Sequence, residues 1–254
     1  MMKLNQWVKQ LEDIAPIELA MDYDNVGLLI GTEKEITKVL VALDLSVPVA
    51  EEAISKKVDL VLTHHPVFFH PIKRILPNDP ETAAAYKLIQ NGIGMYAAHT
   101  NLDACNGGVN DVLAQMFNLQ KVSQLREDGI GRMGFLMNPV KFSELINKCN
   151  HLFQTKVCYH GDFNQIIYKV CVIGGAGGDL VSDAVKNNCD VFIIGEMRHH
   201  EAMQASFYGI NIIVAGHYQT EVVILKNLIS RLQMNGNSVE YIESSSECAP
   251  LTTL

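Results

Sequence analysis

The sequence predicts an α/β protein with two similar lobes, each a mixed sheet covered by helices, related by internal duplication. Short apolar segments alternate with helical segments along the chain, which is typical of sheets flanked by helices. The second half repeats the pattern of the first half at a constant offset. The chain has 254 residues, of which 48% are hydrophobic and 19% charged, so it has enough apolar material for such cores.

The elements of the first half follow from hydrophobic periodicity and from turn residues. An amphipathic helix is expected over 4–14, and a turn at 22–27 leads into a strand at 28–30. Apolar runs predict the next strands, and periodic segments between them predict helices. The expected strands are 39–43, 60–63 and 93–98, and the expected helices are 47–57, 81–90 and 110–117.

The duplication is visible in two pairs of segments. One pair, at an offset of 131 residues, is KVLVALDLSVPVAEEAISKKVDLVLTHH and KVCVIGGAGGDLVSDAVKNNCDVFIIGE. The other pair, at an offset of 117, is GIGMYAAHTNLD and GINIIVAGHYQTE, so the first half holds 14 additional residues around 70–80. General likeness between βαβ units explains a long constant offset less well than duplication does. We predict lobes at 1–125 and 126–254, with the C-terminal helix able to pack back on the first.

Net charge and hydropathy argue against two classes of partner, nucleic acids and membranes. The net charge is −8 and no run of Lys or Arg exceeds two residues, which argues against general nucleic-acid binding. No apolar stretch approaches the roughly 20 residues that span a bilayer. The N-terminal segment has no apolar region with a cleavage site, as a signal peptide would. We therefore expect a cytoplasmic protein without a membrane partner.

Two adjacent histidines follow the strand expected at 60–63. Ligands of open α/β sheets bind beyond the carboxyl ends of the strands, so this position is informative. Pro66 removes a backbone donor and ends the strand, which lets the imidazoles of His64 and His65 turn towards one site. A solvated loop with two histidines is an equally good interpretation of this motif alone.

Two further strand ends carry potential metal ligands. Asp103 follows the strand at 93–98, where it could also be a turn residue or a helix cap. A helix is expected to begin near His217 and continue to residue 229, which puts His217 and Glu221 at i and i+4 on one face. Such a pair taken alone is more often a surface ion pair than a pair of ligands.

The convergence of the three strand ends points to a metal centre. Three imidazoles and two carboxylates suit two ions only if a carboxylate bridges and water completes the coordination, as catalytic sites allow. Mixed nitrogen and oxygen ligands favour Zn²⁺, Mn²⁺, Fe²⁺, Co²⁺ or Ni²⁺ over Ca²⁺ or Mg²⁺. The predicted ligands are His64, His65, Asp103, His217 and Glu221.

A second polar cluster follows the strand at 191–194. The repeat places Glu196 where the first half has His65. Glu196, together with His199 and His200, could therefore serve as a general base or contact the substrate. Alternatively, Glu196 and Arg198 begin a helix, and the two histidines lie on its exposed face. His99 could orient a ligand from outside the coordination sphere.

The glycine-rich segment at 174–179 follows a strand and precedes a helix. Backbone amides at a helix start can bind phosphate, but the segment matches neither the dinucleotide-binding nor the Walker pattern. We interpret it as a tight strand-to-helix turn, with a phosphate contact as the alternative.

Motifs along nearly the whole chain together resemble the Nif-three-like family, whose members are often called GTP cyclohydrolase 1 type 2 homologues. The chain matches the short form, and Tyr23 stands where many members have Trp. These motifs are DNVGL at 24–28, THHP at 63–66, AHTNLD at 98–103, GGVND at 107–111, GE at 195–196 with HH at 199–200, and GHYQTE at 216–221.

The resemblance implies a dinuclear metal site between two lobes, with the five ligands named above and Glu221 as the bridge. It also implies a toroidal homohexamer and hydrolytic opening of the GTP imidazole ring with release of formate. In that reaction a metal-activated water would be the nucleophile. A phosphoesterase and a non-enzymatic metal-binding scaffold that recruits a partner protein are the alternatives.

Overall fold

The computed structural model of the chain, described for residues 2–234, 236 and 238–251, divides into two compact units. The first unit extends to Cys105 and includes Leu225–Cys248, whereas Asn106–Ile224 forms most of the second. The predicted boundary after residue 125 therefore falls inside the second unit. The strand at 120–124 pairs with a strand of that unit, which explains the earlier boundary.

The first unit is built on a five-stranded sheet in the order β1-β4-β3-β2-β11. β1 runs antiparallel to β4, and the remaining neighbours are parallel. The strands are β1 (Gly27–Ile30), β2 (Lys38–Ala42), β3 (Leu60–Thr63), β4 (Gly94–Ala97) and β11 (Glu240–Glu243).

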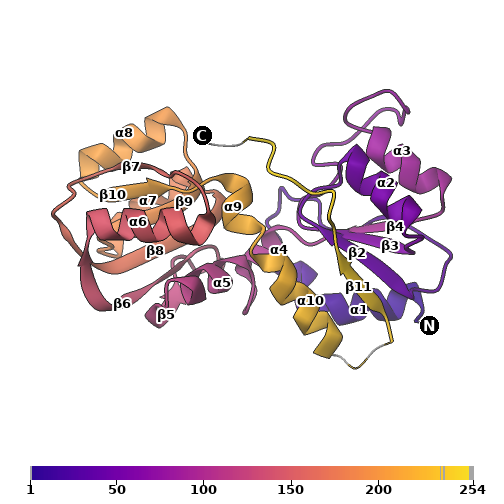
Figure 1. Ribbon diagram of the computed structural model, residues 1–254, viewed down its shortest axis with the longest axis horizontal. Helices are drawn as coiled ribbons and strands as arrows, with labels where there is room; N and C mark the ends of the chain where they lie inside the picture. Colours follow the sequence, from indigo (N-terminus) through magenta and orange to yellow (C-terminus); the bar gives the residue numbers. More distant parts are fainter. Residues whose placement is uncertain (1, 235, 237, 252–254) are drawn as a thin grey trace. The chain divides into compact units, whose positions relative to one another are not determined.

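Helices cover both faces of this sheet (Figure 1). α2 and α3 lie on one face, where Leu40, Val61 and Met95 belong to a buried apolar cluster with residues of both helices. α1 covers the opposite face, and the ring of its Trp7 meets that of Tyr96 edge to face at 5.9 Å. The helices are α1 (Leu4–Glu12), the 3₁₀ turn η1 (Ile17–Leu19), α2 (Val47–Ser55), α3 (Ala83–Gln90), α4 (Thr100–Ala104) and α10 (Ile224–Met234).

The second unit contains a six-stranded mixed sheet in the order β5-β6-β8-β9-β10-β7. β8, β9 and β10 are parallel, and β5, β6 and β7 are antiparallel to their neighbours. The strands are β5 (Gln120–Gln124), β6 (Arg132–Lys141), β7 (Cys158–His160), β8 (Ile166–Ala176), β9 (Val191–Glu196) and β10 (Asn211–Val214).

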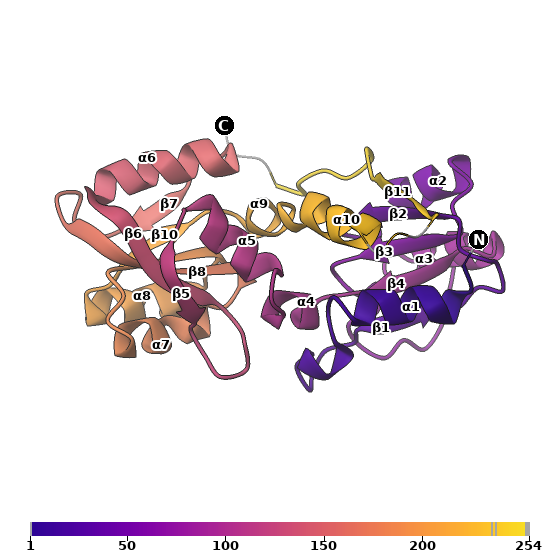
Figure 2. The ribbon, with the colours of Figure 1, turned by 90° about the horizontal axis from the view of Figure 1, so that it is seen from below.

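Helices also cover the two faces of the second sheet. α7 and α8 lie on one face and α6 on the other (Figure 2). The helices are α5 (Val109–Met116), α6 (Phe142–Phe153), the 3₁₀ turn η2 (Gly178–Leu180), α7 (Val181–Lys186), α8 (His199–Tyr208) and α9 (His217–Glu221). The single helix expected from His217 to residue 229 is wrong, because the chain is helical in α9 and again from Ile224 in α10, with a turn at 222–223.

The sheet registers confirm the internal duplication. Val39 pairs with Leu60 in the first unit, and Val170 pairs with Val191 in the second, which is the 131-residue offset. Leu60 pairs with Gly94 and Val191 with Asn211, so the offset of 117 residues is also kept. The 131-residue offset also relates the carboxylates of Asp59 and Asp190, each of which accepts backbone N–H bonds at the start of the neighbouring strand.

A buried carboxylate fastens the C-terminal segment to the first unit. Glu52 of α2 accepts hydrogen bonds from the hydroxyls of Ser244 and Ser245 and from the amides of Ser245 and Ser246. Lys56 forms an ion pair with it at 2.7 Å. Burial alone would raise the pKa of Glu52, but Lys56 and the serine donors outweigh it and hold the pKa well below its usual range.

We expect Glu52→Gln to lower the free energy of unfolding by about 2 kcal/mol at pH 7, because its partners lose a charged acceptor. The pKa of Glu52 is lower in the folded state than in the unfolded chain, so the ionised carboxylate stabilises the fold at pH values above the unfolded pKa of about 4.3. This stabilisation is lost as the pH falls below that value. Urea unfolding should therefore show the gap between wild type and variant closing as the pH falls below about 4. Glu51→Gln, an exposed ion-pair residue next along the helix, should change little at either pH. An equal effect of both substitutions would contradict the prediction.

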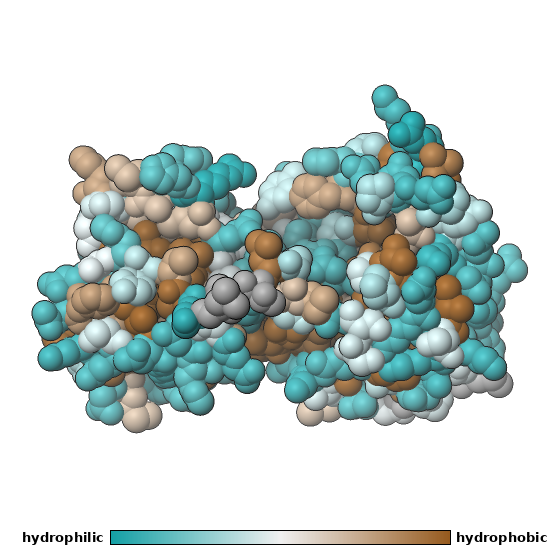
Figure 3. Space-filling view, turned by 45° about the horizontal axis from the view of Figure 1, so that its top comes forward, coloured by the Kyte–Doolittle hydropathy of each residue, from teal (hydrophilic) through white to brown (hydrophobic). Residues whose placement is uncertain are grey.

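None of the helices in the described part of the chain has the length and apolar character needed to cross a membrane. Apolar side chains gather in separate patches among hydrophilic ones on the face drawn in Figure 3.

Candidate metal centre

Three histidines of the first unit lie together at the carboxyl ends of β3 and β4. The rings of His64 and His65 have centroids 5.0 Å apart, and His99 lies 5.1 and 5.4 Å from them. One ring nitrogen of each lies within 4.8 Å of the others. β3 ends at Thr63 and β4 at Ala97, so sheet geometry brings the three side chains to one edge.

Each of these imidazoles is oriented through Nδ1. The Nδ1 of His64 donates to the carbonyl of Ala98 at 2.9 Å, because a carbonyl oxygen can only accept. His65 contacts the Asp44 carboxylate through Nδ1 at 2.8 Å. This arrangement presents Nε2 of both rings as the acceptor nitrogen, which is how metal-binding histidines are held.

The carboxylate of Asp24 orients His99 and the start of α4. It accepts from His99 Nδ1 at 2.9 Å and from the amide and hydroxyl of Thr100 at 3.0 and 2.5 Å. Burial alone would raise the pKa of Asp24, but the bonds from His99 and Thr100 outweigh it and hold the pKa well below its usual range. Asp24 is therefore a charged, preorganised partner of His99.

Asp103 belongs to α4 and faces the same histidine cluster. Its Oδ1 lies 3.7 Å from Nε2 of His64. Two ligands of one transition metal, each about 2 Å from the ion, stand about 3 to 4 Å apart. The separation between these two atoms therefore fits joint coordination.

The second unit carries the other pair of predicted ligands on α9. The Nε2 of His217 lies 3.1 Å from a carboxylate oxygen of Glu221, in the expected i, i+4 relation. The buried hydroxyl of Thr220 accepts from the amide of Gly175 at 3.0 Å, which fastens α9 to the end of β8. Glu221 is only 3% exposed.

The glycine-rich end of β8 makes room for these ligands. A Cβ on Gly175 would stand 2.0 Å from a carboxylate oxygen of Glu221 and 3.2 Å from Nε2 of His217, and the backbone there has φ +62°. Gly178 begins η2, a helix of three residues. The segment is therefore the tight turn that the sequence predicts, shaped by close packing.

Glu196 ends β9, as expected from the repeat, and lies beside His217. Its carboxylate oxygen is 3.3 Å from the Nδ1 of His217, and its side chain is 60% exposed. A carboxylate on the far nitrogen of a ligating histidine is the usual support for a metal ligand. Glu196 thus makes an orienting contact with His217.

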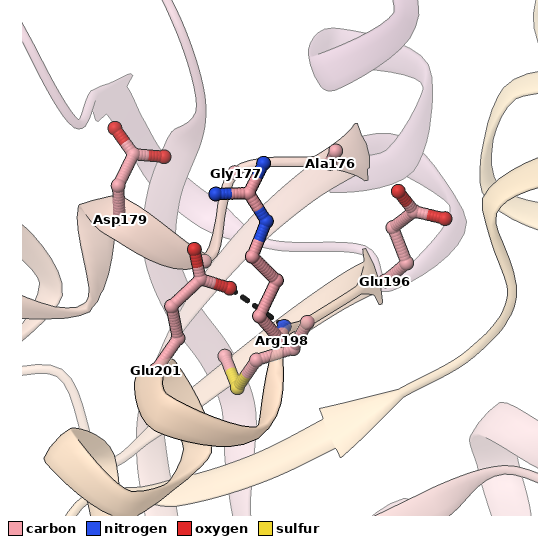
Figure 4. Close-up of a pocket in the computed structure, with 8 residues that line it drawn as sticks. Ala176, Gly177, Asp179, Glu196, Arg198 and Glu201 are labelled. Atoms are coloured by element: carbon pink, nitrogen blue, oxygen red, sulfur yellow. Dashed lines mark hydrogen bonds between the residues drawn. The ribbon is translucent and has the colours of Figure 1, made fainter.

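A pocket of about 520 Å³ adjoins Glu196 in the second unit. It is lined by Glu196, Met197, Arg198, Glu201 and the turn Ala176–Asp179 (Figure 4). The amide of Arg198 donates to the Glu201 carboxylate at 2.7 Å. The lining contains three carboxylates and one guanidinium, a balance of charge that disfavours a phosphate.

The structure groups the predicted site residues within each unit. It brings His64, His65 and Asp103 together in the first unit, and His217, Glu221 and Glu196 together in the second. His199 and His200 lie exposed in the first turn of α8. The donor set of imidazoles and carboxylates in both clusters fits divalent transition metals.

Sequence reasoning missed two carboxylates that support histidines, Asp24 beside His99 and Asp44 beside His65. Asp44 follows β2, so the strand-end rule applied to the first strand of the repeat would have found it. The amide of Asp44 in turn donates to Glu247 at 3.1 Å, a residue 203 positions further along the chain. No local pattern indicates that contact.

Comparisons with known proteins place the chain in a family. Residues 2–250 match the family model Duf34/NIF3 (NGG1p interacting factor 3). A Clostridium perfringens protein named GTP cyclohydrolase 1 type 2 homolog is 36% identical over 96% of both chains. A Schizosaccharomyces pombe protein named Protein NIF3 homolog is 33% identical over 97% of this chain and 96% of its own.

Solved structures share the whole architecture. A Staphylococcus aureus hypothetical protein superposes with a TM-score of 0.91 at 27% identity, covering 100% of this chain and 99% of its own. Reduced HcgD from Methanocaldococcus jannaschii gives a TM-score of 0.84 at 31% identity, over 96% and 98% of the two chains. The family model spans nearly the full length, and relatives above 30% identity are matched end to end. The chain belongs to the DUF34/NIF3 family.

Proposed function

We propose that the chain is a dinuclear metal-dependent hydrolase that opens a ring of a nucleotide-like substrate, as the name GTP cyclohydrolase 1 type 2 homolog of its relatives suggests. In this proposal five residues of the chain would hold the ions. The ligands are His64, His65, Asp103, His217 and Glu221.

The observation that carries the proposal is the orientation of the histidines. Nδ1 of His64, His65 and His217 faces an oxygen of Ala98, Asp44 and Glu196 respectively. Such support costs conformational entropy, and solvent-exposed histidines have no need of it. It is the arrangement expected when Nε2 must stay deprotonated and aimed at a metal ion.

The bound ions would supply a water of lowered pKa and polarise the bond under attack. The chain itself supplies the remaining chemistry. Glu196 is exposed enough to reach substrate, and we assign it acceptance of a proton at its carboxylate while it holds His217 in place. His199 and His200 begin the next helix and complete this proposed acid–base group.

The resemblance also implies a homohexamer, and that assembly stays a prediction together with the cytoplasmic location. On α8, Met203 and Phe207 are exposed one helical turn apart, at 59% and 86%. An apolar surface of this kind suits contact between copies of the chain.

The test is formate release from GTP by protein loaded in turn with Zn²⁺, Mn²⁺, Fe²⁺, Co²⁺ and Ni²⁺. We expect turnover with at least one metal, and kcat about 100-fold lower for Glu196→Gln with metal in excess. Exposed Glu127→Gln serves as the control. Absence of formate with every metal would reject the cyclohydrolase reaction. Recovery of a partner protein by an inactive chain would favour the scaffold alternative.

A further inference from the structure

The loop that joins β3 to α3 distinguishes the first unit from the second. In the second unit β9 ends at Glu196 and α8 begins at His199, whereas in the first β3 ends at Thr63 and α3 begins at Ala83. This accounts for the 14 additional residues of the first half. Duplicated units share a scaffold, so an addition beside the histidine cluster of one unit is a candidate for a specific role.

The loop places an aromatic ring against the histidine cluster. The centroid of Phe69 lies 6.2 Å from that of His99 and 6.4 Å from that of Tyr23. Phe69 is 42% exposed and Tyr23 is 69% exposed. Two large aromatic side chains thus present accessible surface next to His99, which itself adjoins His64 and His65.

The backbone that carries both rings is held in place. The side-chain amide of Asn25 donates to the carbonyl of Phe68 at 2.5 Å and so links the two segments. Asp24 binds His99 and Thr100, as described above, and the amide of Met21 donates to the Thr100 hydroxyl at 3.0 Å. Tyr23 and Phe69 therefore project from anchored positions.

We propose that Tyr23 and Phe69 form a stacking surface that binds the planar heteroaromatic ring of the substrate beside His99. The inference rests on the proposed function, because it names the substrate class of the same site. A π-face accepts any planar base, and each base stacked on an aromatic side chain contributes about 1–3 kcal/mol. A ring held there lies next to the histidines of the candidate metal centre.

The test measures binding of guanosine and GTP by calorimetry, with ribose 5-phosphate as the probe that lacks the base. We expect Phe69→Ala and Tyr23→Ala each to weaken guanosine and GTP binding about 10-fold or more. Phe69→Trp should bind guanosine and GTP about as well as the wild type. Phe69→Leu should bind them as weakly as Phe69→Ala, because leucine has no π-face. Phe163→Ala removes an exposed ring from the other unit and should leave affinity unchanged.

Metal content and oligomeric state of each variant separate this inference from the proposed function. Unchanged metal content with weakened guanosine binding supports the stacking surface. Guanosine binding that Phe69→Ala leaves intact, or no guanosine binding by the wild type, overturns it. A change in oligomeric state with unchanged ring affinity would assign these rings to contact between copies and likewise overturn it. A chain that takes up no metal but binds guanosine through Phe69 would reject the hydrolase and keep the stacking surface.

Discussion

Replacing Glu221 by alanine is expected to remove most of the bound metal, with affinity falling at least about 100-fold. The Glu221 carboxylate is almost fully buried and lies 3.1 Å from Nε2 of His217, so in the proposed centre it would supply negative charge to the ions. Loss of this carboxylate would remove both a ligand and a buried negative charge from the centre. Elemental analysis after equilibrium dialysis should give about two metals per wild-type chain and well under one for the variant.

Two controls keep this result interpretable. Glu127→Ala removes an exposed carboxylate from the same unit and should retain both metals. Circular dichroism and urea unfolding of apo Glu221→Ala would show whether the fold survives. A folded variant with full metal content would refute the assignment of Glu221. A wild type that binds no metal after reloading would refute the whole centre.

Gly195→Ala is expected to lower the free energy of unfolding by about 3 kcal/mol. A Cβ at Gly195 would stand 2.5 Å from the hydroxyl of Thr220 and 2.6 and 2.8 Å from the backbone oxygen and nitrogen of Gly175. Backbone atoms cannot rotate away as the end of a side chain can, so β8 and β9 must shift apart. The displaced Thr220 would also release α9, and metal affinity should fall with stability.

Urea unfolding provides the measurement, and Gly31→Ala is the matched control. A methyl group at Gly31 would have no heavy atom within 4 Å, and the backbone there has no positive φ, so this substitution should cost less than about 1 kcal/mol. Equal losses of unfolding free energy for Gly195→Ala and Gly31→Ala would show that the close packing at Gly195 does not contribute to stability.

The resemblance between the halves of the chain predicted more than the fold class. Because strands of a duplicated unit keep their register, the offset of 131 residues was enough to identify Glu196 as a strand end. The prediction of a continuous helix after His217 failed for a related reason. Periodic apolar residues continue through Val222 and Val223, and only packing of the following segment with the first unit reveals the break.

The sequence by itself determined the alternation of strands and helices, the duplication, and the imidazoles and carboxylates that follow the strands. All of these can be recognised from the local periodicity of apolar residues and from the spacing of motifs. Only the tertiary structure decided which carboxylate supports which histidine. Asp24 meets His99 and Asp44 meets His65 because strand order places separate loops at one edge of the sheet. The same reason applies to Glu247, whose contact with Asp44 depends on β11 returning to pair with β2.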